Sequence, residues 1–176
     1  MLTISLIMVI NQQGYKKVAQ YCRFDGYPYG VGVGVLNFIK NKELFEKFKI
    51  NLSKVRFLDK KGIDKEFYES FNKNAPKWLN DKDNRTQKEK DWFDNYYNVD
   101  LSENSLVNIA NSIDNEIILV DSEYIANHGL AEYSYVINLK KNTFEVYRHI
   151  DKKTIKIYKL DELPKEDVFI SELKNF

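Results

Sequence analysis

A glycine-rich stretch, residues 22–34, constrains the fold of this chain most strongly. It reads CRFDGYPYGVGVG and holds four of the seven glycines in the sequence. Polar and apolar residues alternate before it, as in a half-buried strand, and apolar residues recur at helical spacing after Val35. Because glycine permits positive φ angles and close backbone approach, we expect a tight connection here between a strand and a helix.

A glycine-rich loop between a strand and a helix can bind phosphate through its backbone N–H groups. On this hypothesis Gly26, Gly30 and Gly32 would approach the phosphate, and Tyr27 or Tyr29 would stack on a base. The stretch lacks both the GxGxxG spacing and the Lys-Ser/Thr ending of the known nucleotide-binding fingerprints. The alternative is that the glycines only allow the strand and the helix to pack closely.

The remaining pattern predicts one α+β domain over residues 1–176, with a mainly antiparallel sheet and several helices. Alternating residues indicate an N-terminal hairpin and a C-terminal meander of three strands. Residues 50–100, rich in lysine and aromatic residues, are interpreted as a variable charged insertion. The expected hairpin strands are 2–10 and 16–24, the meander strands are 131–139, 143–150 and 154–160, and the clearest helices are 31–48 and 101–113.

The net charge of +1 conceals an uneven distribution along the chain. Residues 40–90 contain 15 Lys and Arg against 9 Asp and Glu, whereas residues 91–139 contain 9 Asp and Glu and no Lys or Arg. Such a pair of segments can form a bipolar surface that attracts partners of either sign. Alternatively, the two segments lie against each other and neutralise their charges locally.

Cysteine content and hydropathy bear on the compartment. The single cysteine, Cys22, allows no disulfide within the chain, as is typical of the reducing cytoplasm. Residues 1–10 are apolar, but they have no basic lead-in and are too short to span a bilayer. We therefore expect a cytoplasmic protein that does not enter the membrane.

Few residues form a recognisable catalytic constellation. Cys22 and His128 would make a nucleophile and base if the fold brought them together, and Asp25 would offer a general base. A lone cysteine on an apolar strand face is more often a small buried hydrophobe. The other histidine, His149, falls within an expected strand, where a packing or surface role fits best.

The residues that could bind a metal ion also form no recognisable motif. Asp121, Glu123, His128 and Glu132 carry the donor types that Mg²⁺ or Mn²⁺ prefers. Carboxylates grouped in an acidic loop usually only solvate it, and no repeated acidic motif supports a metal here. We expect no metal or cofactor, and we favour binding over catalysis.

Two motifs resemble a family of small phage and prophage proteins. The first is the Cys-x-x-Asp-Gly-Tyr motif of residues 22–27, followed by the glycines. The second is a tyrosine-rich hairpin, YSYVIN followed by FEVY, with a Leu-Pro pair after the third strand. The similarity covers both ends of the chain, about half of it, and leaves residues 50–100 unmatched.

The resemblance implies an accessory protein of the host cytoplasm that inhibits bacterial defence, such as an anti-CRISPR protein binding a Cas9-type effector ribonucleoprotein or its guide RNA. Residues 91–139 would then occupy a basic channel of the effector, and residues 40–90 would contact RNA. The alternatives are a protein that sequesters a nucleotide signal and a metal-assisted nuclease acting on RNA or another phosphodiester. The acidic residues expected to contact the partner are Asp91, Asp94, Asp100, Glu103, Asp121 and Glu123.

Overall fold

The computed structural model describes residues 3–57, 104–119, 121–123, 126 and 129–174. A five-stranded sheet in the order β2-β1-β5-β6-β7 organises them, beside a two-stranded sheet of β3 and β4. The strands are β1 (Ser5–Ile10), β2 (Lys16–Cys22), β3 (Val55–Phe57), β4 (Ile117–Leu119), β5 (Tyr133–Asn138), β6 (Thr143–Arg148) and β7 (Lys153–Lys159). The helices are α1 (Val33–Lys40), α2 (Lys42–Asn51), α5 (Asn104–Asn111) and α7 (Glu166–Leu173).

The pairing of the strands confirms the predicted α+β class with a mainly antiparallel sheet. Strands β1 and β2 form the N-terminal hairpin, and β5, β6 and β7 form the C-terminal meander. The two units are joined by parallel pairing of β1 with β5, in which Ile7 lies opposite Tyr135. This one parallel contact makes a continuous sheet of two antiparallel pieces that are far apart in the sequence.

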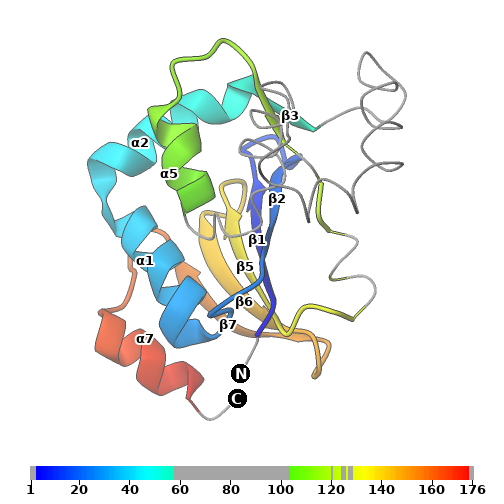
Figure 1. Cartoon of the computed structure of the whole chain (residues 1–176). Coiled ribbons are helices and arrows are strands. Elements are labelled where there is room, and N and C mark those ends of the chain that lie inside the picture. Colours follow the sequence, from blue (N-terminus) through cyan, green and yellow to red (C-terminus); the bar gives the residue numbers. More distant parts are fainter. Residues whose placement is uncertain (1–2, 58–103, 120, 124–125, 127–128, 175–176) are drawn as a thin grey trace, which may run out of the picture.

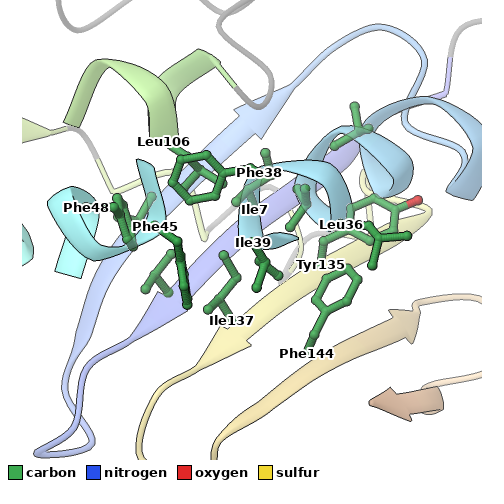
Figure 2. Packing of buried hydrophobic residues seen from close by; sticks show 14 of the residues in the cluster. Ile7, Leu36, Phe38, Ile39, Phe45, Phe48, Leu106, Tyr135, Ile137 and Phe144 are labelled. Atoms are coloured by element: carbon green, nitrogen blue, oxygen red, sulfur yellow. The ribbon is translucent and has the colours of Figure 1, made fainter. Parts of the chain in front are cut away.

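The helices cover one face of the five-stranded sheet (Figure 1). Alternate residues of the strands point to this face, because side chains in a strand alternate between its two sides. Figure 2 shows Ile7, Tyr135 and Ile137 projecting from β1 and β5 towards the side chains of α1. The core cluster includes Leu36, Phe38, Ile39, Phe45, Phe48, Leu106 and Phe144, all buried.

The helix expected over residues 31–48 is wrong in its extent. A turn of π-helix, Pro28–Gly32, comes first, α1 ends at Lys40, and α2 begins at Lys42. Asn41 separates the two helices because its side-chain oxygen accepts the N–H of Leu44 at 3.2 Å, the usual bond of a helix N-cap. The break redirects the chain so that both helices pack on the sheet.

The small sheet brings the basic and acidic segments together. Strand β3 belongs to residues 40–90 and β4 to residues 91–139, and the two pair in parallel. Lys17 of β2 donates from Nζ to the carbonyl oxygen of Val55, 2.8 Å away. The expected insertion over residues 50–100 lies mostly outside the described residues and stays a prediction.

Candidate functional site

The glycine-rich stretch uses its own backbone N–H groups for internal hydrogen bonds. Gly26 donates to the carbonyl oxygen of Thr3 at 3.1 Å, and Val31 donates to that of Asp25 at 2.8 Å. The N–H groups of Gly30 and Gly32 point to the carbonyl oxygen of Tyr27, at 3.0 and 3.3 Å. These donors are therefore engaged in holding the turn, which favours the packing interpretation over a phosphate site.

The two tyrosines of this stretch stack on each other. The ring centroids of Tyr27 and Tyr29 are 5.2 Å apart, with the planes inclined by 12°. Tyr27 also lies 6.3 Å from the ring of Tyr133 in β5. One face of each ring is thus occupied by its neighbour, and stacking of either tyrosine on a base stays a prediction.

The weak catalytic candidates are not assembled in the part of the chain that the structure describes. Cys22 is 1% exposed, at the end of β2 and within the core, which agrees with a buried hydrophobe and places its thiol out of reach of solvent. Asp25 is exposed in the turn, where its φ angle is 50°. His128 lies outside the described residues, so its pairing with Cys22 is untested.

Three described members of the acidic segment, Glu116, Asp121 and Glu123, are bound to basic residues of the same chain. Lys16 of β2 bonds to Asp121 at 2.7 Å and also to Glu123, and Arg56 of β3 bonds to Glu116 at 2.5 Å. Burial lowers the pKa of Lys16, but the hydrogen bonds to the two carboxylates outweigh this effect and raise it overall. Of these pairs, only Arg56 with Glu116 joins the basic segment 40–90 to the acidic segment 91–139, so local neutralisation between the two segments holds for that pair, whereas Lys16 belongs to neither segment.

The remaining acidic candidates, Asp91, Asp94, Asp100 and Glu103, lie outside the described residues. Their contact with a partner stays a prediction. Among the described residues, no group of three or more side chains is placed to hold a metal ion. Likewise, no helix in the described ranges is long and apolar enough to cross a membrane.

A hollow of about 620 Å³ lies on the sheet face opposite the helices, and we refer to it as the open-face hollow. Four strands contribute to its floor through residues that alternate with the core positions of the same strands. The strand residues are Met8, Ser134, Val136, Glu145, Tyr147 and Thr154. The surrounding loops add Glu123, Ala126, Gly129, His149 and Lys152.

The strand register explains why these side chains share one face. Val136 of β5 lies opposite Met8 of β1 and Glu145 of β6, and Ser134 lies opposite Tyr147. Residues directly opposite each other in neighbouring strands present their side chains to the same side of the sheet. A carboxylate, a hydroxyl and a phenol are thus set among apolar side chains.

Glu145 is the most desolvated carboxylate in this hollow. Its side chain is 15% exposed, and its register neighbours across the strands are Val136 and Ile157, both apolar. The hydroxyl of Thr143 donates to Oε1 at 2.7 Å, while Nζ of Lys141 is 3.7 Å from the same oxygen. The carboxylate therefore has one strong donor among the described residues.

His149 and Ser134 form a hydrogen-bonded pair at the rim of the same face. Nε2 of the imidazole is 2.7 Å from Oγ of Ser134, and burial lowers the pKa of His149. The ring of Tyr147 meets that of His149 edge-on at 4.8 Å. In the described residues no carboxylate hydrogen-bonds to the imidazole, so the pair has two of the three parts of a nucleophile triad.

The sequence pattern does not identify this site. It places His149 in an expected strand, where a packing or surface role fits best, and it singles out neither Ser134 nor Glu145. The available signal was the alternation in β5 and β6, where the aromatic and aliphatic positions of one face are interleaved with serine, glutamate and tyrosine. Polar positions of this kind are also typical of an ordinary solvated sheet face, so the pattern alone cannot distinguish a binding site.

Comparison with family models, with curated proteins and with solved structures finds no significant match to this chain.

Proposed function

We propose that this chain is a binding protein that holds a small organic molecule in the open-face hollow. The observation that carries the proposal is the convergence of polar side chains from four strands on one hollow of about 620 Å³. Ligand pockets typically measure roughly 300–1,000 Å³ and combine an apolar lining with a few placed polar groups. Met8 and Val136 supply apolar floor here, and Glu145 and Ser134 supply polar groups.

A binding role fits the groups better than catalysis does. The hydrogen bond between Ser134 and His149 resembles the start of a nucleophile arrangement, but catalysis also needs donors aimed at the developing charge. Ser134 lies inside a regular strand, so the neighbouring backbone N–H groups take part in strand pairing with β1 and β6. The pair is therefore assigned to positioning a bound ligand.

The resemblance to phage proteins provides a biological setting for such a protein. Capture of a small molecule in the host cytoplasm is one way to interfere with a defence pathway, and it corresponds to the sequestration alternative drawn from the sequence. We place the ligand site in the hollow and not in the glycine-rich stretch, because the N–H groups of that stretch are already hydrogen-bonded.

Direct binding to a defence effector is a second proposal, supported by the nine acidic residues and no Lys or Arg of residues 91–139. Its test is a pull-down of the tagged protein from cells that carry a type II CRISPR locus. A stoichiometric effector protein that survives nuclease treatment would support it, and recovery of no macromolecule would contradict it.

The ligand-binding proposal is tested by native mass spectrometry with a defined mixture of cationic, neutral and anionic metabolites. Val136→Trp should fill the hollow from its floor, and Ile113→Trp, at a position 94% exposed beyond α5, is the matched control. Both variants are first checked for an unchanged circular dichroism spectrum. We expect an adduct with the wild type and Ile113→Trp that disappears with Val136→Trp.

Two outcomes would contradict ligand binding at this site. One is the absence of any adduct with the wild type across the whole mixture. The other is an adduct that Val136→Trp retains at full strength, because filling the floor of the hollow must displace a ligand held there.

A further inference from the structure

We propose that the ligand of the open-face hollow is an organic cation, whose protonated amine or guanidinium group binds to Glu145. This inference rests on the proposed function, since it specifies the ligand of the same hollow. It departs from the nucleotide expected from the sequence, because it assigns the hollow to positive charge.

Glu145 projects from an interior strand of the sheet, which shields most of its side chain. Strand β6 is an interior strand with β5 on one side and β7 on the other. The carboxylate lies between Val136 and Ile157 in register, and only 15% of its side chain is exposed. The neighbouring strands thus shield most of this side chain, and its small exposed part faces the hollow, where a ligand can reach it.

The carboxylate of Glu145 has few partners among the described residues. Thr143 donates one hydrogen bond to Oε1, and Oε2 receives none from the described residues. Lys141 is 3.7 Å from Oε1 with a side chain that is 67% exposed. That distance is too long for a hydrogen bond, so Lys141 attracts the carboxylate without donating to it. The oxygen Oε2 is thus left for an external donor.

The remaining lining of the hollow offers little positive charge to an anionic ligand. Glu123 is bonded to Lys16, and Lys152 is the lone lysine or arginine among the described lining residues. Burial lowers the pKa of His149, which keeps the imidazole neutral near pH 7. A phosphate would be repelled by the carboxylate of Glu145 and would face the ammonium groups of Lys152 and Lys141, whereas a cation could bind to Oε2, which has no donor among the described residues.

Neighbouring groups define the rest of the ligand. Tyr147 lies two residues along β6 from Glu145 and lines the same hollow, so its ring can add a cation–π contact. Ser134 is diagonal to Glu145 across the β5–β6 pair, which places the two residues roughly 7 Å apart. The ligand therefore combines a cationic head with a hydrogen-bonding group a few bonds away.

Two isosteric probes test this assignment without altering the protein. Butylguanidine carries a guanidinium group and no other charged group, and butylurea replaces it with a neutral urea of nearly the same shape. We expect isothermal titration calorimetry to show butylguanidine binding at least about tenfold more tightly than butylurea, because a charge-assisted hydrogen bond is lost. Equal affinities for butylguanidine and butylurea would overturn the proposal.

A matched pair of variants tests whether Glu145 is the residue that binds the cation. Glu145→Gln keeps the shape and removes the charge, and Glu132→Gln makes the same change at an exposed glutamate outside the hollow lining. We expect butylguanidine to bind about tenfold or more weakly to Glu145→Gln and equally to Glu132→Gln. Unchanged binding to Glu145→Gln would overturn the assignment.

Thermal unfolding of the free protein separates a ligand-binding carboxylate from a structural one. The described residues give the Glu145 carboxylate a single hydrogen bond, from Thr143, which a glutamine carbonyl can also accept, so Glu145→Gln should unfold at close to the same temperature as the wild type. A clearly lower midpoint would assign the carboxylate to structural support and overturn the proposal.

Failure of this inference is distinguishable from failure of the proposed function. If an anionic probe such as AMP, or a neutral metabolite, binds to the wild type and is lost with Val136→Trp, the hollow is a ligand site but the cation assignment is wrong. If no probe of any charge binds, both proposals fail. Butylguanidine binding that Val136→Trp leaves intact would also overturn the location at Glu145.

Discussion

Tyr135 donates its phenolic hydrogen to the carbonyl oxygen of Gly26 across 2.7 Å, joining the middle of the sheet to the glycine-rich stretch. Tyr135 is fully buried on β5, 109 positions along the chain from its acceptor. Burial raises the pKa of this phenol well above its usual range, so the hydroxyl remains protonated and available as a donor.

Removal of this hydroxyl is expected to destabilise the protein by about 1–3 kcal/mol. Tyr135→Phe keeps the ring in the core but leaves the Gly26 carbonyl without this donor. The measurement is the free energy of unfolding in urea. Tyr147→Phe is the matched control, because its hydroxyl has no hydrogen bond among the described residues. Equal effects of the two substitutions would show that the bond to Gly26 is not stabilising.

Gly30 should not tolerate a side chain. An added Cβ atom would lie 2.2 Å from the carbonyl oxygen of Asp25, a backbone atom that the bond from Val31 holds in place. We expect Gly30→Ala to cost roughly 1–3 kcal/mol or more, because the turn must open to relieve the clash. Thermal unfolding measures the effect, and a midpoint equal to that of the wild type would contradict this close approach.

Asn51 holds the end of α5 against α2. Its Nδ2 lies 2.9, 3.1 and 2.9 Å from the carbonyl oxygens of Ile109, Ala110 and Ser112, and the residue is 7% exposed. Helix C-termini leave such oxygens without intrahelical donors, and the Asn51 amide supplies them. The side chain therefore acts as a C-terminal cap provided by a neighbouring helix.

Loss of the Asn51 amide should destabilise the protein, and the size of the effect should depend on the side chain that replaces it. Asn51→Ala is expected to cost about 1–3 kcal/mol, and Asn51→Asp more, because a carboxylate would face carbonyl oxygens without a donor. Denaturant unfolding measures both. The same change at exposed Asn111 should cost only about 0.3–1 kcal/mol, through the charge at a helix C-terminus. A mild Asn51→Asp variant would contradict the capping role.

The stability of the protein should decrease on acidification through a contribution from His149. Burial lowers the pKa of this imidazole below its usual 6.5, so the unfolded chain takes up the proton at a higher pH than the folded one. Between these two pKa values the unfolded state binds more protons, and the free energy of unfolding falls as the pH drops through about 6.5.

The pH dependence is measured by urea unfolding at about pH 7.5 and about pH 5.5, on either side of the usual histidine pKa. His149→Gln removes the titration while keeping a group that can bond to Ser134. Its stability should vary less with pH than that of the wild type. A variant with the same pH dependence as the wild type would assign the effect to other groups.

Local patterns in the sequence were sufficient for the strands and for part of the helices. Alternation placed the hairpin and the meander, because a strand with one buried face repeats every two residues. The helix over residues 31–48 was overextended because apolar spacing continues past Asn41, and only the cap bond to Leu44 reveals the break. The helix expected over residues 101–113 is described over Asn104–Asn111, with Ile113 exposed beyond its end.

The candidate site was missed because its members are brought together by strand register. Glu145 and Ser134 are unremarkable in the sequence, and their proximity follows from the pairing of Ser134 with Tyr147. The glycine-rich stretch has an unusual composition and therefore stands out in the sequence as a possible phosphate site. In the structure its N–H groups form hydrogen bonds within the chain.

The α+β class, the hairpin, the meander and the uneven charge follow from residues near one another in the chain, and they can be predicted without a structure. The parallel pairing of β1 with β5, the ion pair between Arg56 and Glu116 and the hollow around Glu145 become visible only in the folded chain. These contacts join segments that are distant in the chain, and their geometry depends on how the whole core packs. The periodicity of apolar residues predicts which face of a strand is buried, but it does not predict which residues lie beside the opposite face.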